Sequence, residues 1–254
     1  MQATLLGTGT SQGVPIIGCS CEVCTSTDAR DQRLRTSLLF SHEGRNVAID
    51  AGPDFRQQML RAGVKSLDAV VLTHEHNDHI IGLDDVRPFN FLQNHHMPLY
   101  GTSPVLAEVR ERFAYIFAKN PYPGAPMIDP VAITKDAPFE VAGFRFTPIE
   151  VMHGSLSVLG FRIADFAYVT DMKTIHPAEK RKLEGVHTLV VNALHIQQHP
   201  THLNLADALD FIGQIKPAQA WITHISHRMG LHEEVTKRLP KGVGLGWDGL
   251  VVEF

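Results

Sequence analysis

Three histidines and one aspartate fall within six positions of the chain, directly after an apolar run at 69–72. These metal-binding positions are His74, His76, Asp78 and His79. A strand that ends at Thr73 can aim His74 and His76 to one side, because alternate residues of a strand share a face. Imidazole suits zinc, manganese and iron alike, and a neighbouring carboxylate fits a pair of ions about 3.5–4 Å apart. The pattern therefore predicts a metal site with room for two ions.

The alternative reading of this segment is a solvated turn that happens to be rich in histidine. The chain has 15 His in 254 residues, and H-x-H-x-D-H would then arise by chance in roughly three per thousand chains of this composition. The position after a strand lowers that frequency further. We therefore interpret the segment as functional.

Length and charge limit the remaining interpretations. At 254 residues the chain is long enough for one large α/β domain, expected over 1–254. A net charge of −4 and a pI near 6.4 leave no global basic field of the kind that binds nucleic acid. The sequence shows neither a run of ~20 apolar residues nor a secretory signal. We expect a cytoplasmic protein with no membrane or nucleic-acid partner, and a homodimer is left open.

All three cysteines, Cys19, Cys21 and Cys24, lie within one short segment. An odd number this tightly spaced argues against a disulfide framework, because one thiol is left over and a bridge between near neighbours is strained. Three thiolates would supply three of the four ligands of a tetrahedral structural zinc, with one Cys or His still to come from elsewhere. A reactive or accidental thiol cluster is the alternative.

Apolar periodicity and turn residues predict the order of elements. Strands are expected at 2–7, 37–41, 46–50, 69–73, 98–100, 139–151 around Gly143, 158–170 around Asp165, 186–192, 218–223 and 243–254, the last with a turn at Asp248–Gly249. Helices are expected at 53–62, 83–94, 103–119 with Ser103 as N-cap, 205–215 and 232–239. Residues 120–130 hold four prolines and are expected to form an exposed loop. Two sheets packed face to face with helices outside would bury these strands.

Three further strand ends carry metal-competent side chains, namely His153, Asp171 and His224. Each residue taken singly is more often a turn or cap residue. Taken together with the segment that begins at His74, they are what a loop-lined site on one edge of a sheet sandwich would need.

These residues resemble those of the metallo-β-lactamase superfamily of αββα dinuclear hydrolases. The cysteine segment and the tail from Thr223 to His227 are similar to the PhnP-type phosphoribosyl cyclic phosphodiesterases. The resemblance implies that His74, His76 and His153 bind one metal, and that Asp78, His79 and His224 bind the other. Asp171 would bridge the two ions. Cys19, Cys21, Cys24 and His227 would bind a structural zinc, and the active-site ions would be manganese or zinc, with iron as a further option.

His202 matches the position of the family's proposed general acid, although His195 and His199 lie in the same loop and remain alternatives. Asp50 is expected to support the His74 loop through hydrogen bonds. The other histidines are interpreted as surface residues; these are His42, His95, His96, His176, His187 and His232.

The expected reaction is hydrolysis of a phosphodiester, with Asp171 orienting the attacking oxygen and His202 protonating the leaving group. In the resembled branch the substrate is a cyclic phosphate on ribose, so the resemblance implies a small phosphorylated substrate. Two alternatives remain: an enzyme similar to the tRNA 3′-processing endonucleases, and an accessory or carrier protein similar to PqqB of pyrroloquinoline quinone biosynthesis. The intact set of histidines at 74–79 favours an enzyme.

Overall fold

The computed structural model describes all residues 1–254, and the strands form two mixed sheets. The first sheet has the strand order β15-β1-β2-β3-β4-β5-β6, so it joins both ends of the chain. Its strands are β1 (Gln2–Gly7), β2 (Ser37–His42), β3 (Arg45–Ile49), β4 (Ala69–Val71), β5 (Met97–Gly101), β6 (Ile128–Ala132) and β15 (Val251–Glu253). From β3 to β6 the neighbours are parallel.

The second sheet has the order β11-β8-β9-β10-β12-β13-β14, and β7 pairs with β8. Its strands are β7 (Phe139–Val141), β8 (Phe144–His153), β9 (Leu156–Ile163), β10 (Phe166–Val169), β11 (Thr174–Ile175), β12 (Thr188–Asn192), β13 (Gln219–Thr223) and β14 (Val243–Leu245). The strands β10, β12, β13 and β14 run parallel to one another.

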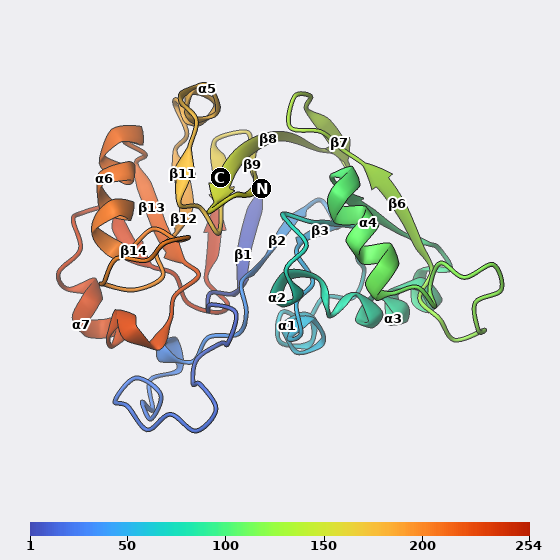
Figure 1. The fold of residues 1–254 in the computed structure, drawn as a ribbon, viewed down its shortest axis with the longest axis horizontal. Coiled ribbons are helices and arrows are strands. Elements are labelled where there is room, and N and C mark those ends of the chain that lie inside the picture. The colour runs from blue at the N-terminus through green and yellow to red at the C-terminus, as the bar shows by residue number, and fades with distance from the viewer.

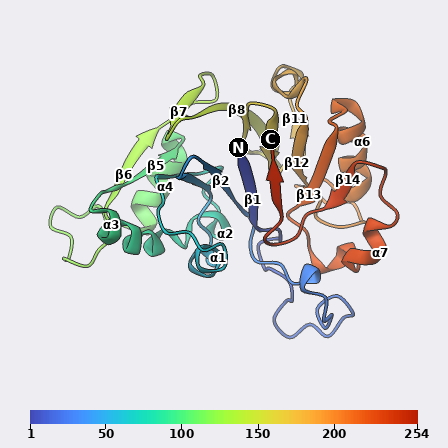
Figure 2. The same cartoon turned by 180° about the vertical axis from the view of Figure 1, so that it is seen from behind.

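Helices cover the outer face of each sheet, as Figures 1 and 2 show from two sides. One set lies against the first sheet: α1 (Phe55–Arg61), α2 (Asn77–Ile80), the 3₁₀ helix η2 (Leu83–Val86), α3 (Arg87–Gln93) and α4 (Ser103–Arg112). The other set lies on the side of the second sheet: α5 (Pro177–Lys180), η3 (Arg181–Leu183), α6 (Leu205–Ile215), η4 (His227–Met229) and α7 (His232–Thr236). The short η1 (Ala29–Asp31) lies in the loop after β1.

Three hydrophobic cores hold these layers together. The central core joins the two sheets and includes Phe40 from β2 and Phe161 from β9. The two outer cores lie between each sheet and its helices. This arrangement confirms the predicted αββα sandwich, because each sheet buries both faces.

Helix α6 shows how local sequence sets an element. The Asn204 side chain accepts a hydrogen bond from the Asp207 backbone N–H at 2.8 Å, which caps the first turn. Ala208, Phe211 and Ile212 then form the buried stripe. The helix ends at Ile215, and the next residue, Lys216, has a left-handed φ of 57°. The observed bounds are those predicted from the sequence.

Several predicted boundaries are wrong, among them those of a helix, a loop and a strand. The helix expected over 103–119 ends at Arg112, because Phe113 leaves helical geometry, and Thr102 rather than Ser103 is its N-cap residue. The proline-rich loop ends where β6 begins, and β6 contains Pro130. Proline is tolerated there because β6 is the last strand of its sheet.

The third difference concerns the last strand. Residues 243–254 form two strands in different sheets, β14 and β15. Between them the Gly246 N–H bonds the Ile222 carbonyl and the Gly249 N–H bonds the Leu5 carbonyl, so the segment crosses from the second sheet to the first. The turn expected at Asp248–Gly249 is part of this crossing.

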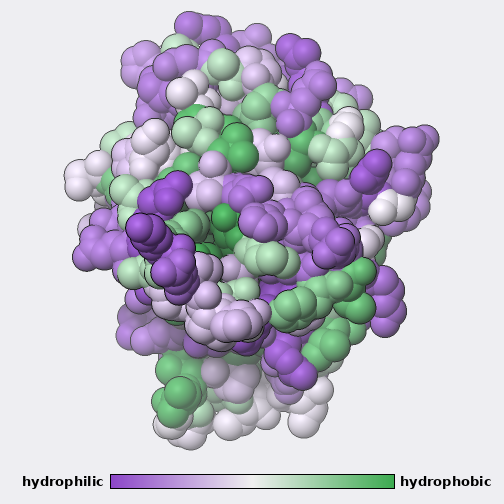
Figure 3. Space-filling model, turned by 90° about the vertical axis from the view of Figure 1, so that its right-hand side faces the viewer, coloured by the Kyte–Doolittle hydropathy of each residue, from purple (hydrophilic) through white to green (hydrophobic).

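The surface is mixed in character. On the face shown in Figure 3, hydrophilic atoms interrupt the hydrophobic ones throughout. None of the helices combines the length and the apolar character that crossing a membrane would require.

Candidate metal centre

The candidate ligands come together near the carboxyl ends of strands in the two sheets, and most of these strands are parallel to a neighbour. β3 leads to Asp50, β4 leads to the loop from Thr73 to His76, β10 leads to Asp171 and β13 leads to His224. Asp50, Asp171 and His224 have left-handed φ values of 63°, 57° and 55°. A left-handed backbone is uncommon for residues other than glycine and concentrates at functional sites. His224 thus bends the chain directly after β13, and His227 begins the 3₁₀ helix η4.

Asp171 lies at the centre of the cluster and is 2% exposed. One carboxylate oxygen is 3.4 Å from His79 Nε2, and the other is 3.1 Å from His224 Nε2. Asp78 approaches the same two rings, at 3.3 Å from His79 Nε2 and 4.0 Å from His224 Nε2. The structure thus brings together Asp78, His79 and His224, with Asp171 beside them.

The other three histidines lie next to this group. The ring centroids of His74 and His76 are 4.6 Å apart, and those of His76 and His153 are 5.3 Å apart. The ligand atoms of His74, His79 and Asp171 lie within 4.8 Å of one another, as do those of His153, Asp171 and His202. Asp171 belongs to both of these groups, which is the placement expected of a residue between two ions.

Several ring nitrogens at this centre are buried and have no hydrogen-bond partner. They are Nε2 of His74 and of His79, Nδ1 of His202 and both ring nitrogens of His224. An unpaired polar atom in a buried site is costly. The convergence of these imidazoles with two carboxylates fits divalent cations, which would satisfy the nitrogens.

Outer hydrogen bonds fix the orientation of several of these side chains. Asp50, fully buried, accepts from His79 Nδ1 at 2.6 Å and from the Thr73 backbone N–H at 2.8 Å. His153 Nδ1 lies 2.8 Å from the Thr201 carbonyl. The Thr170 hydroxyl donates to Asp171 at 2.6 Å. The support expected from Asp50 is present, whereas Thr170 and Thr201 carry no sequence signal that would have identified them.

Charge and burial shift the pKa values of these side chains in different directions. Burial lowers the pKa of His74 well below its usual value. Burial alone would also lower the pKa of His79, but the carboxylates of Asp50 and Asp171 hold it well above the usual value. For Asp171, the imidazoles of His224 and His79 outweigh burial and hold the pKa well below its usual range. A cation that binds His79 Nε2 must therefore displace a proton.

Among the three loop histidines, His202 lies nearest the centre. Its Nδ1 is 3.8 Å from Asp171, and its ring centroid is 4.3 Å from that of His153. Burial, followed by the charge of His224, lowers the pKa of His202 to about 2. His199 is half-buried beside it, and the His195 ring packs against His199.

The histidines interpreted as surface residues are exposed, with one exception. His232 is 3% exposed, and its Nδ1 accepts a hydrogen bond from the buried Arg33 at 3.2 Å. The sequence interpretation was wrong for this residue, because its partner lies almost 200 positions away and leaves no local pattern.

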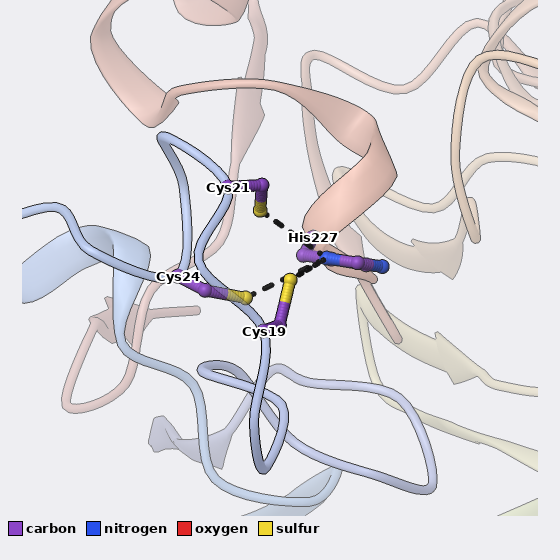
Figure 4. A group of neighbouring side chains, drawn as sticks. All are labelled: Cys19, Cys21, Cys24 and His227. Atoms are coloured by element: carbon purple, nitrogen blue, oxygen red, sulfur yellow. Dashed lines mark hydrogen bonds between the residues drawn. The ribbon is translucent and has the colours of Figure 1, made fainter.

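The cysteine loop has its expected fourth side chain, as Figure 4 shows. His227 Nδ1 lies 3.3 Å from the sulfur atoms of Cys19 and Cys21 and 3.5 Å from that of Cys24. All three cysteines are free. A set of three thiols and one imidazole that surround one point is suited to tetrahedral zinc.

A family model described as the beta-lactamase superfamily domain matches residues 45–225, which include the whole dinuclear candidate centre. The chain belongs to the metallo-β-lactamase superfamily. Within this superfamily it resembles a diphosphatase from the PhnP family: that crystal structure is 40% identical, with a TM-score of 0.93, over 100% of this chain and 98% of the other.

Two other proteins similar to this chain carry names of different functions. Zinc-bound PqqB from Methylobacterium extorquens shares the fold, with a TM-score of 0.81, 19% identity and full coverage of both chains. An octanoyltransferase of Porphyromonas gingivalis is 44% identical over 252 residues, which are 98% of this chain and 51% of that protein. The chain therefore spans about half the length of this relative.

Proposed function

We propose that this metal-dependent hydrolase is a dinuclear phosphodiesterase that opens a ribose cyclic phosphate or a similar small cyclic phosphodiester. The observation that carries the proposal is the position of Asp171, whose Oδ2 lies 3.4 Å from His79 Nε2 and whose Oδ1 lies 3.1 Å from His224 Nε2 and 3.8 Å from His202 Nδ1. The likeness to the PhnP-family diphosphatase supports chemistry at phosphorus.

Each proposed ligand set draws on more than one element. His74, His76 and His153 would bind one ion; Asp78, His79 and His224 would bind the other, and Asp171 would bridge them. When bound, two divalent ions lower the pKa of a water and neutralise charge that develops on phosphoryl oxygens. Asp171 would orient the attacking oxygen, and Asp50 would hold His79 with its Nε2 toward the centre. The same metals suit both sets, so manganese and zinc are proposed, with iron as a further option.

His202 is proposed to protonate the leaving oxygen. Its low pKa makes it neutral in the free protein at neutral pH. An anionic phosphoryl group beside the ring would favour the charged form. We therefore place its protonation in the substrate complex. Cys19, Cys21, Cys24 and His227 are proposed to bind a structural zinc outside the reaction.

A second candidate reaction is hydrolysis of a diphosphate. It is favoured by the crystal structure of a PhnP-family diphosphatase, which aligns over the whole chain. Both substrates present a P–O bond to the same pair of cations, so the first ligand shell does not separate them. The octanoyltransferase relative adds a thioester to the substrates to be tested, although about half of that protein has no counterpart here.

The test is an activity screen of metal-reconstituted protein. The substrates are a ribose 1,2-cyclic phosphate, a 2′,3′-cyclic nucleotide, an aryl phosphodiester, a dinucleoside diphosphate, an octanoyl thioester and a precursor tRNA. The proposal expects the highest kcat/KM on a cyclic phosphodiester. Preference for the diphosphate would select the second candidate, and activity on the thioester alone would overturn both.

A small substrate is proposed in preference to RNA because the chain carries a net charge of −4. RNA binding, if it occurred, would weaken steeply with salt as phosphate contacts release counterions. A steep salt response together with cleavage of precursor tRNA would contradict this part of the proposal.

A further inference from the structure

His76 differs from the other histidines of its proposed ligand set. His74 Nδ1 lies 3.0 Å from the Thr73 hydroxyl, and His153 Nδ1 lies 2.8 Å from the Thr201 carbonyl. His76 is exposed, and the structure shows no hydrogen bond to its ring. Since metal-binding histidines depend on outer partners for their orientation, the position of His76 must be held through its backbone.

The backbone of this loop is tied at several points. Thr73 is bonded through its N–H to Asp50 and through its carbonyl to the Leu159 N–H. The His76 carbonyl accepts the His79 N–H at 2.9 Å, which begins α2. Between these points lies Glu75, and its carbonyl accepts a hydrogen bond from Arg112 Nη1. Arg112 thus contacts the peptide unit that joins Glu75 to His76.

Arg112 is itself well placed to act as an anchor. It is the last residue of α4, whose Val105, Leu106 and Val109 are buried in the core against the first sheet. Its second guanidinium nitrogen, Nη2, lies 3.0 Å from Glu108 Oε2, one helical turn earlier. The guanidinium is therefore held from the helix side and bonds the loop with its other nitrogen.

We propose that Arg112 is a positioning residue, which holds the Glu75–His76 peptide so that His76 can complete its metal site. Through this contact α4 supports a ligand that has no outer partner for its ring. The inference rests on the proposed ligand set, because it assumes that His76 binds a metal. Loss of the contact should lower the affinity for the ion that His76 binds together with His74 and His153. The affinity for the other ion should not change.

A purely structural role makes a different prediction. A basic residue at a helix C-terminus interacts favourably with the helix dipole, and the Glu108–Arg112 pair supports the helix by about 0.2–0.5 kcal/mol. If Arg112 served only α4, then Glu108→Gln and Arg112→Met would both lower thermal stability slightly, and neither would change metal affinity.

Binding of Mn²⁺, followed by the EPR signal of the free ion, separates the two roles. Mn²⁺ prefers oxygen and nitrogen ligands, so the cysteine site does not interfere. Arg112→Met and Arg112→Gln are titrated beside the wild type, with Arg112→Lys as the conservative variant and Glu108→Gln as the matched control. We expect one of two bound ions to have a dissociation constant about tenfold higher in the Met and Gln variants. Lys should restore part of this loss, and Glu108→Gln should bind as the wild type does.

The outcomes are distinct. Unchanged affinity for both ions in Arg112→Met and Arg112→Gln would overturn the inference while leaving the proposed function intact. Equal weakening in Glu108→Gln would overturn it as well, since the Gln oxygen still accepts from Arg112 Nη2 and the contact to Glu75 is kept. A wild-type protein that binds no Mn²⁺ outside the cysteine site would contradict the proposed function itself. Thermal unfolding in the presence of EDTA shows that each variant is folded.

Discussion

At the scale of single residues, the buried carboxylate of Asp50 organises one half of the centre without being a proposed ligand. It accepts from the His79 ring, from the Thr73 N–H and from the Thr73 hydroxyl. The first of these bonds engages His79 Nδ1 and so turns Nε2 toward the centre, and the other two fix the start of the His74 loop. One side chain therefore sets both the tautomer of a ligand and the path of the chain that carries others.

Asp50→Asn tests this role. The amide keeps the shape but loses the charge that favours the N–H at His79 Nδ1, so we expect metal affinity and kcat/KM to fall by roughly 10–100-fold. Asp68→Asn is the control, because the Asp68 carboxylate pairs with Arg45 and contacts none of the candidate ligands. Wild-type metal affinity in Asp50→Asn would show that His79 is oriented by other contacts.

Tyr168 shows the opposite situation, since its buried hydroxyl has no hydrogen-bond partner. Burial, and then the nearby charges of Asp50 and Asp171, raise its pKa well above the usual value. Tyr168→Phe removes the unpaired hydroxyl and keeps the ring, so the free energy of unfolding should stay level or rise by about 1 kcal/mol. Urea denaturation measures it, and a fall of more than about 1 kcal/mol would reveal a partner for the hydroxyl.

At the scale of elements, helix α7 is joined to the loop between β1 and β2 through two buried basic side chains, His232 and Arg33. Arg33, 4% exposed, donates to His232, to the Thr8 hydroxyl and to the Gly246 carbonyl. The pairing requires a neutral His232, because a protonated ring would place two cations in contact. Burial, followed by the charge of Arg33, accordingly lowers the pKa of His232 to about 4.

This coupling predicts a pH dependence of stability. The folded protein binds the His232 proton less readily than the unfolded chain, whose pKa is near 6.5. The contribution is therefore complete above pH 6.5 and is lost as pH falls from there toward 4. The difference in unfolding free energy between wild type and His232→Gln should shrink over that range. A difference that stays constant would mean that His232 titrates normally.

The loop between β1 and β2 extends beyond both sheets (Figures 1 and 2), and side-chain contacts rather than secondary structure hold its cysteine segment. Residues 19–24 form no helix or strand, and the sulfur atoms converge on His227 of η4. If zinc joins these four side chains, Cys24→Ser should remove one zinc and lower the Tm, whereas Ser20→Ala in the same loop should change neither. Zinc content is measured by inductively coupled plasma mass spectrometry. The same zinc content in Cys24→Ser as in the wild type would exclude the proposed site.

At the scale of the whole molecule, the sequence pattern predicted those features that depend on interactions between residues close in the chain. The αββα layers, the bounds of α6 and the metal-competent strand ends all follow from periodicity, capping and residue type. What the sequence could not provide depends on distant partners. Nothing near Arg112 points to Glu75, nothing near His232 points to Arg33, and the division of 243–254 between two sheets depends on where Leu5 and Ile222 lie.

The site illustrates the same limit. Imidazoles and carboxylates at strand ends could be predicted as a group, because parallel strands deliver their carboxyl ends to one edge. The outer contacts from Thr170 and Thr201 could not, since threonine is common in strands and loops and has no spacing of its own. The central position of His202 relative to His195 and His199 also depends on the folded loop.

The most direct test of the account is the metal content of Asp171→Ala, measured beside wild type and Cys24→Ser after reconstitution with zinc and removal of excess ion. The account predicts three equivalents in the wild type. It predicts a loss of the active-site ions with the cysteine zinc retained in Asp171→Ala, and two equivalents in Cys24→Ser. A wild type with one equivalent, or an Asp171→Ala protein that keeps all three, would contradict the claim that these side chains form a two-metal centre.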